Sequence, residues 1–288
     1  MRGAGTRAGR LTPEVLVDGG AGRPVPAHDR GLNYGDGLFE TIRFVAGHAP
    51  LWRLHMARLR NGCRRLRLPP PDARTLEGEA ARLAGGRDCI IKLVVTRGDG
   101  RGYAPGDGAR RVLSRHPVPA MPARAWRDGV RLRWCRLRLS TQPLLAGLKH
   151  LNRLENVLAR GEWRDARIHE GLLCDQDGHV VCATAANLFI VRDGVLLTPW
   201  LDRCGVAGVA RAWILRQARR RLPVVECDLD RDAVLMADEV FICNAVRGIV
   251  PVAGVGNRRY RVGPVTRSLG YTLASLGIGQ PPGTAADR

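Results

Sequence analysis

The sequence predicts an α+β fold in two parts. Strand patterns fill the middle of the chain, and helical patterns interrupt them irregularly. Three closely spaced prolines, Pro117, Pro119 and Pro122, indicate an exposed connection between the parts. We therefore divide the 288 residues into a flexible start (1–12), a smaller N-terminal α/β domain (13–116), a linker (117–123) and a larger C-terminal domain (124–288).

Periodicity predicts the elements of the first part. Apolar residues recur at helical spacing after Trp52, and a β-branched run surrounds Lys92. The glycine-rich segment 29–37 leads into a strand that ends near Phe44, and Ala46-Gly47 is expected to turn this strand back as a hairpin. The other expected elements are strands at 14–17 and 89–96 and helices at 52–66 and 71–84.

The second part is expected to be richer in strands. Asp177-Gly178 and Asp193-Gly194 are typical hairpin turns. A helix is expected to follow residues 203–211 and to end near Leu222. The remaining expected elements are strands at 130–139, 170–174, 179–184, 187–191 and 239–243 and helices at 153–164 and 265–276.

Lysine is almost absent from this basic chain. Of 46 lysine and arginine residues, only Lys92 and Lys149 are lysines. A desolvated lysine can lose its proton and form a Schiff base, whereas arginine stays charged. Lys92 lies in a predicted strand and is expected to be exposed on a sheet. Lys149 lies between a loop and a helix, where catalytic groups are common, and is the stronger candidate.

The formal charge of +19 invites a nucleic-acid hypothesis. However, arginine is spread over the whole length and no nucleic-acid motif accompanies it, so we expect no specific nucleic-acid binding. A small anionic substrate fits the charge equally well. No apolar run approaches the roughly 20 residues that span a bilayer, and no signal peptide is visible, so a cytoplasmic protein without membrane contact is expected.

Eight cysteines are scattered without a Cys-x-x-Cys pair, which argues against a zinc site and a disulfide framework. We expect no metal. Two segments are better candidates for binding. The glycine-rich loop 97–106 carries Arg97 and Arg101, which could bind carboxylates, although a mobile surface loop is an equal alternative. The helix start near Gly208 would offer backbone amides to an anion.

Several separated motifs together resemble one family, the fold type IV pyridoxal-phosphate enzymes, which include branched-chain and D-amino acid aminotransferases. The resemblance extends over roughly residues 14–275. Its motifs are Asp29-Arg30-Gly31 with 34–41, His55-x-x-Arg58-Leu59, Lys149-x-x-Asn152, Asn187-Leu188-Phe189, and Thr198-Pro199 with Gly208-Val209-x-Arg211. It implies the two-domain architecture of the D-amino acid aminotransferases, bound pyridoxal 5'-phosphate, and a homodimer with active sites near the subunit interface.

The resemblance also implies roles for individual residues. Lys149 would hold the cofactor as a Schiff base and act as the acid–base group. Arg97 and Arg101 would bind substrate carboxylates. The cofactor-binding residues would be Arg58, Lys149, Cys182, Gly208, Val209, Asn244 and Ala245.

One position departs from the family. Cys182 stands where the family carries a glutamate that keeps the pyridine nitrogen protonated, and no acid nearby in the sequence replaces it. A neutral thiol is a weak hydrogen-bonding partner, so the cofactor would be a poorer electron sink. A weaker electron sink should slow transamination more than it slows elimination.

Within the family, the segments 147–155, 97–103 and 242–245 most resemble those of aminodeoxychorismate lyases, although the substrate loop is one residue shorter than expected. The resemblance implies elimination of pyruvate from 4-amino-4-deoxychorismate to give 4-aminobenzoate, a reaction of folate biosynthesis. Two alternatives stay open. One is an aminotransferase of D- or branched-chain amino acids, and the other is a catalytically impaired homologue.

Overall fold

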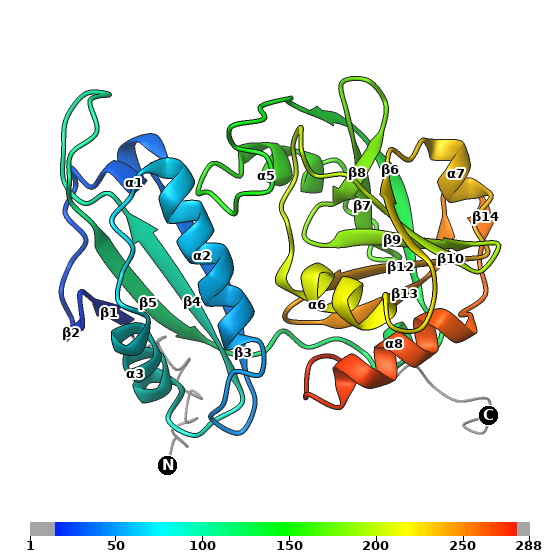
Figure 1. Ribbon diagram of the computed structural model, residues 1–288, viewed down its shortest axis with the longest axis horizontal. Helices are drawn as coiled ribbons and strands as arrows, with labels where there is room; N and C mark the ends of the chain where they lie inside the picture. The colour runs from blue at the N-terminus through cyan, green and yellow to red at the C-terminus, as the bar shows by residue number, and fades with distance from the viewer. Residues whose placement is uncertain (1–14, 281–288) are drawn as a thin grey trace, which may run out of the picture.

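Two β-sheets organise the chain, one in each half of the sequence (Figure 1). The computed structural model describes residues 15–280, so the predicted flexible start at 1–12 lies outside the described residues. The chain passes from the first sheet to the second through residues 117–123. Mixed sheets and helices confirm the predicted α+β class, while the division into domains with a linker stays a prediction.

The smaller sheet is antiparallel, in the order β2-β1-β5-β4-β3. One face packs against two helices around a core that includes Leu38, Ile42 and Leu93. Side chains alternate along a strand, so Phe39, Thr41 and Lys92 lie on the other face. The elements are β1 (Val15–Val17), β2 (Gly20–Ala21), α1 (Arg30–Tyr34), β3 (Gly37–Phe44), α2 (Trp52–Leu66), α3 (Ala73–Ala84), β4 (Cys89–Thr96) and β5 (Arg110–His116).

The larger sheet has the order β11-β10-β9-β12-β13-β6-β7-β8, with β14 beside β13. A further pairing, between Cys182 of β8 and Asn187 of β9, closes part of this sheet on itself. The elements are α4 (Arg124–Arg127), β6 (Val130–Leu139), α5 (Leu154–Arg160), β7 (Ile168–Asp175), β8 (Val180–Ala183), β9 (Asn187–Arg192), β10 (Val195–Pro199), α6 (Val209–Ala218), β11 (Val224–Cys227), α7 (Arg231–Leu235), β12 (Glu239–Asn244), β13 (Gly248–Val255), β14 (Arg258–Arg259) and α8 (Pro264–Ala274).

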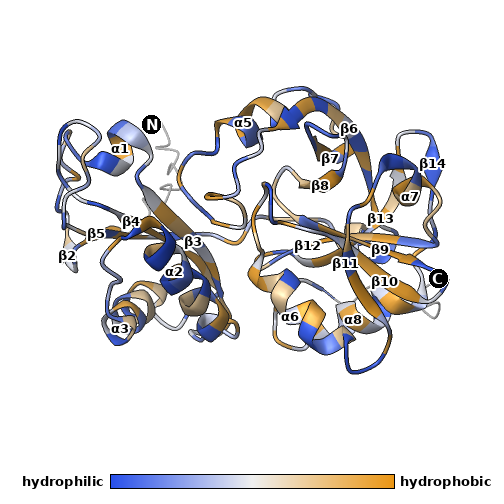
Figure 2. Ribbon diagram, turned by 45° about the horizontal axis from the view of Figure 1, so that its top comes forward, coloured by the Kyte–Doolittle hydropathy of each residue, from blue (hydrophilic) through white to orange (hydrophobic). Residues whose placement is uncertain are grey.

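Apolar strands form the interior of the larger half. Phe189 of β9 and Phe241 of β12 stack with ring centroids 5.0 Å apart, beneath α6 and α8. Figure 2 shows hydrophobic residues concentrated on the strands, whereas hydrophilic residues colour α2 and many loops. In the described part of the chain, no helix is both long and apolar enough to cross a membrane.

Some local predictions were wrong. The glycine-rich segment contains a short helix, α1, because the Asp29 side chain caps the Gly31 amide and Gly35 ends the helix in the left-handed region. Ala46-Gly47 makes a tight turn between Val45 and His48, but the chain then enters α2 and not a partner strand. The antiparallel partner of β3 is β4, which follows two helices later.

Candidate active site

The Lys149 segment lies between the two halves and is hydrogen-bonded to both. On one side, the Phe39 amide donates to the Lys149 carbonyl at 2.9 Å, and the Leu151 amide donates to the Gly37 carbonyl at 3.0 Å. On the other side, Gly147 exchanges two backbone bonds of 3.0 Å with Gly205 and Ala207. Gly147 has a φ of 77°, a conformation that favours glycine. The backbone therefore fixes where Lys149 emerges.

The environment of Lys149 favours a neutral amine. Burial, followed by the charge of Arg58, lowers the pKa of Lys149 to about 7, and Glu40 opposes this shift. Arg153 and Lys92 contribute in the same direction as Arg58. The Lys149 Nζ atom lies 4.1 Å from the centroid of the Phe39 ring. A substantial fraction of this amine is therefore unprotonated, and nucleophilic, near neutral pH.

Arg58 is held by a buried carboxylate whose role the sequence did not reveal. The Arg58 Nε atom donates to one Glu40 oxygen at 2.8 Å, and the Arg58 NH2 group contacts the second Glu40 oxygen. His55 Nδ1 also lies 2.6 Å from Glu40. Although burial opposes ionisation of Glu40, Arg58 lowers the pKa of this carboxyl to about 2. His55 is itself buried, so all three side chains form one compact cluster.

The start of α6 lies beside Arg58. The remaining Arg58 donor, NH1, reaches the Ala207 carbonyl at 3.1 Å, one residue before the helix N-cap, Gly208. No side chain caps the first α6 amides. A Cβ atom on Gly208 would lie 1.9 Å from Asn187 Oδ1, so only glycine fits this approach. Free helix-start amides beside an arginine form a good site for a phosphate.

Asn244 and Ala245 follow β12, whose Cys243 pairs with Asn187 in β9. The Asn244 side chain accepts the amides of Val246 and Arg247 at 3.0 and 2.8 Å. This loop therefore lies near Asn187, which itself contacts Gly208. Together with Lys149, these groups suit a cofactor that combines a phosphate with an aldehyde.

Cys182 is buried in β8, opposite Leu173 and Asn187. Burial raises the pKa of this thiol to about 12, so the side chain is neutral. One acid on the neighbouring strand escaped the sequence prediction. Glu170 of β7 is buried, accepts a hydrogen bond from Thr184, and has a pKa raised by burial. Its place beside β8 was not visible in the sequence, because the pairing of β7 with β8 sets it.

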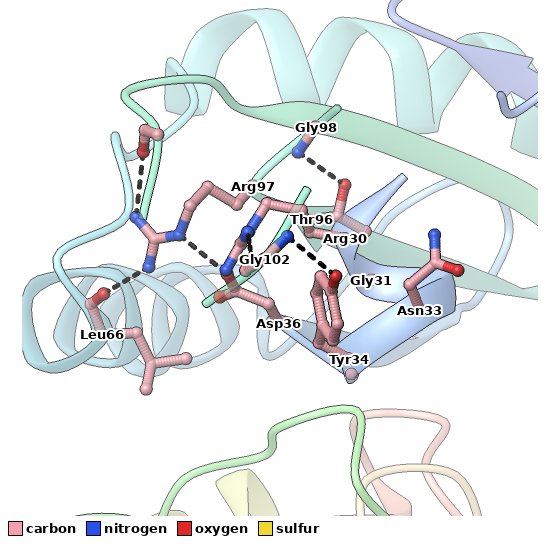
Figure 3. Close-up of polar contacts among 12 residues, drawn as sticks. Arg30, Gly31, Asn33, Tyr34, Asp36, Leu66, Thr96, Arg97, Gly98 and Gly102 are labelled. Atoms are coloured by element: carbon pink, nitrogen blue, oxygen red, sulfur yellow. Dashed lines mark hydrogen bonds and ion pairs between the residues drawn. The ribbon is translucent and has the colours of Figure 1, made fainter. Parts of the chain in front are cut away.

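Arg97 makes its hydrogen bonds within the smaller half. Figure 3 shows its guanidinium turned into the smaller half, where Nε donates to Asp36 at 2.9 Å. The other nitrogens donate to the carbonyls of Leu66 and Arg67 at 2.7 and 2.8 Å. Arg97 is only 5% exposed. Its donors are bonded within the chain, so Arg97 fixes the base of the loop in this structure, and its role toward a substrate stays a prediction.

Arg101 is exposed in the same loop, which projects beyond α1 at the outer side of the smaller half (Figure 1). Arg30 NH1 donates to the Gly102 carbonyl at 2.6 Å, and the Gly102 amide donates to the Tyr34 hydroxyl at 3.0 Å. These contacts order the neighbourhood of Arg101. They do not connect Arg101 to Lys149, so its substrate role stays a prediction.

Comparison with known proteins identifies the class. The model of the class IV amino-transferase family matches residues 37–255, and the chain belongs to this family. The expected fold type IV architecture is thereby confirmed.

Individual relatives narrow the comparison. The aminodeoxychorismate lyase of Vibrio harveyi is 37% identical over 85% of this chain and 94% of its own length. The crystal structure of 4-amino-4-deoxychorismate lyase from Pseudomonas aeruginosa has 49% identity and a TM-score of 0.87, covering 91% of this chain and 98% of its own. The branched-chain amino acid aminotransferase of Escherichia coli has 26% identity and a TM-score of 0.82, covering 94% and 96%.

The scarcity of lysine allows the Lys149 pKa to be measured directly. Reductive methylation of the cofactor-free protein with ¹³C-formaldehyde would label two lysines and the N-terminus. We expect the Lys149 resonance to titrate with a midpoint near 7 instead of the ordinary 10.5, the amine being charged below that pH and neutral above it. Lys149→Arg, which removes the resonance, provides its assignment. A midpoint near 10 would contradict the proposed electrostatics.

Arg97 and Arg101 provide a matched pair of variants. Arg97→Ala should lower the free energy of unfolding by about 3 kcal/mol, because it leaves buried carbonyls and part of Asp36 unpaired. Arg101→Ala removes an exposed side chain and should stay within about 0.5 kcal/mol of the parent. Urea unfolding measures both. Equal stability of the two variants would show that Arg97 does not support the loop.

Proposed function

We propose that the chain is a pyridoxal-phosphate-dependent aminodeoxychorismate lyase, which converts 4-amino-4-deoxychorismate to 4-aminobenzoate and pyruvate. One observation carries the proposal: a Lys149 amine whose pKa is lowered to about 7 lies near Arg58 and the uncapped start of α6. The lyases of Vibrio harveyi and Pseudomonas aeruginosa, at 37% and 49% identity, support this choice of reaction within the family.

The chain's own residues would position the cofactor at both ends. Arg58 and the amides of Gly208 and Val209 bind its phosphate, with Asn244 and Ala245 beside them. The Lys149 amine would hold the cofactor through its aldehyde group. When bound, pyridoxal phosphate supplies an electron sink next to the carbon that loses a proton. Glu40 keeps Arg58 oriented toward the phosphate.

Elimination then requires a base from the protein. Lys149 would act as the base that removes the proton from the ring carbon that carries the substrate amine. The electron pair left behind forms the aromatic ring as the enolpyruvyl oxygen departs, and protonation of the enol yields pyruvate. Because expulsion would consume the negative charge at once, the reaction would tolerate a neutral thiol at Cys182.

We propose a cytoplasmic homodimer. The α5 helix, which follows the Lys149 segment, exposes Leu154, Val157 and Leu158 by 68%, 64% and 57%. An apolar stripe of this kind is typical of a protein–protein contact. In such a dimer, the loop that carries Arg101 is free to serve the substrate site of the other subunit. Specific nucleic-acid or membrane partners are not part of the proposal.

An aminotransferase is the second candidate, because the family and the Escherichia coli structure include this activity. An impaired homologue is the third, and neutral Cys182 is its support. The three differ in products. A lyase releases 4-aminobenzoate and pyruvate, and an aminotransferase converts the bound cofactor to its pyridoxamine form. An impaired homologue does neither.

The direct test supplies the cofactor-loaded protein with enzymatically generated aminodeoxychorismate. We expect equimolar 4-aminobenzoate and pyruvate, measured by fluorescence and a coupled dehydrogenase assay. Lys149→Ala should reduce the rate by at least about 10³-fold, because no other lysine occupies its position. Absence of both products from the loaded parent protein would refute the lyase assignment.

Cys182→Glu tests why elimination is favoured. A carboxylate at this position would stabilise a protonated pyridine nitrogen, so amino acids should convert the cofactor to the pyridoxamine form faster, on the order of tenfold. Stopped-flow absorbance measures this half-reaction. Cys182→Ser, neutral and similar in size, is the control and should resemble the parent. If Cys182→Glu folds, loads cofactor and shows no gain, the thiol does not set the reaction preference.

A further inference from the structure

Arg153 lies where the Lys149 segment becomes helix α5. It is the N-cap residue of α5, and its carbonyl accepts the amide of Val157 at 3.1 Å. The Arg153 Nε atom donates to the His150 carbonyl at 3.0 Å, and the NH2 group contacts His150 Nε2. Within residues 15–280, the NH1 group of Arg153 has no hydrogen-bond partner. One end of the guanidinium is therefore available to another molecule.

The charge of Arg153 has no carboxylate to balance it. Among the residues that the structure describes, no acidic side chain forms an ion pair with Arg153, whereas Arg58 is paired with Glu40. Burial lowers the pKa of Arg153, and Cys182 and then Glu155 oppose this shift. A guanidinium stays protonated in proteins even so. Arg153 therefore contributes an uncompensated positive charge.

Helix α5 fixes Arg153 relative to the strand that carries Cys182. One turn into the helix, the Asn156 side chain donates to the Thr184 carbonyl at 2.9 Å, two residues beyond Cys182. Ala159, which follows in the same helix, is buried in one apolar cluster with Cys182. The start of α5, where Arg153 lies, is therefore held against β8.

The charge of Arg153 reaches both Cys182 and Lys149. Burial raises the pKa of the Cys182 thiol to about 12, and Arg153 acts in the opposite direction. Burial and Arg58 lower the pKa of Lys149 to about 7, and Arg153 adds to this shift. The proposed function places the cofactor with its aldehyde at Lys149 and its pyridine nitrogen toward Cys182. A cofactor bound in this way would have the Arg153 charge beside its ring.

One carboxylate acts on the same position from the neighbouring strand. Glu170 of β7 opposes Arg153 in its effect on the pKa of Cys182. However, burial raises the pKa of Glu170 itself, which favours its neutral form. One Glu170 oxygen accepts from Thr184, and the other lies 3.8 Å from Arg247 NH1. Glu170 is therefore poorly suited to replace the glutamate that the family carries at position 182.

We propose that Arg153 keeps the pyridine nitrogen of the bound cofactor unprotonated. The proposal rests on the proposed function, which supplies the cofactor and its orientation. A cation disfavours protonation of a neighbouring group that becomes positive, and no carboxylate at position 182 opposes this effect. An unprotonated ring would be a weaker electron sink. Arg153 and Cys182 together would then favour a reaction in which the electron pair leaves with an oxygen.

NMR of protein loaded with ¹⁵N-labelled pyridoxal phosphate tests the proposal, because the ¹⁵N resonance of a pyridine moves strongly on protonation. We expect the unprotonated signal in the parent protein at neutral pH. Arg153→Gln should raise the pKa of the ring nitrogen by about 1–2, the effect of losing one nearby charge. Arg153→Lys, which keeps the charge, should stay close to the parent. Arg164→Gln, which removes an exposed charge beyond α5, is the matched control and should leave the pKa unchanged.

The cofactor-free protein provides a second measurement. In the ¹³C-methylated protein, Arg153→Gln should raise the midpoint of the Lys149 resonance by up to about 1, because Arg153 is among the charges that lower the pKa of this amine. Arg164→Gln should leave the midpoint where it is. A Lys149 midpoint that does not respond to Arg153→Gln would show that the charge does not reach the site, and would overturn the proposal.

The nitrogen signal and the products separate this proposal from the lyase assignment. If the parent forms 4-aminobenzoate while its ring nitrogen is protonated at neutral pH, the role of Arg153 is refuted and the lyase assignment stands. A protonated signal that Glu170→Gln removes would assign the control of the nitrogen to Glu170 instead. If the nitrogen is unprotonated and responds to Arg153→Gln, but no 4-aminobenzoate forms, the lyase assignment alone fails.

Discussion

The hydrogen bonds that join the Lys149 segment to both halves are the constraint on which the site depends. Gly37 and Phe39 hold it from the smaller half, and Gly205 and Ala207 hold it from the larger half. Because backbone groups make these bonds, the position of Lys149 does not depend on one flexible side chain. Arg58 and the α6 start, where we propose that phosphate binds, and the Phe39 ring come from different parts of the chain, and the residues around Lys149 lie between them.

Charge balance is the second organising feature. The site gathers Arg58, Arg153, Lys92 and Lys149, and Glu40 is the negative charge that opposes them at Lys149. A net positive site keeps Lys149 reactive and attracts anionic molecules. The same electrostatics therefore serve both the reactivity of Lys149 and the attraction of anions.

Periodicity predicted much of the fold and little of the contact pattern. The helix at 52–66 and the strands at 89–96 and 130–139 were predicted with their observed bounds, because their apolar residues recur without interruption. The strand β5 was missed because arginine and histidine occupy most of its half-buried positions. In this protein, arginine stems cover apolar surface and obscure the alternation that marks a strand.

The sequence alone could point to candidate site residues that lie in short motifs. It could not point to residues whose position depends on contacts between distant parts of the chain. Lys149 and Arg58 lie in short motifs. Arg97 makes its hydrogen bonds with Asp36 and Leu66, which lie 61 and 31 residues away in the sequence. The position of Lys92 depends on the register of β3 against β4, which no local pattern reveals. The role of Glu40 was hidden for the same reason.

The Glu40–Arg58 pair affects the protein before any cofactor arrives. An arginine meant only for phosphate would be an unbalanced buried charge in the empty chain, and such charges are strongly destabilising. Glu40 supplies an internal counterion, and backbone hydrogen bonds anchor the residues around Lys149. The Glu40 carboxylate therefore removes one energetic obstacle to folding of the chain before it binds a cofactor.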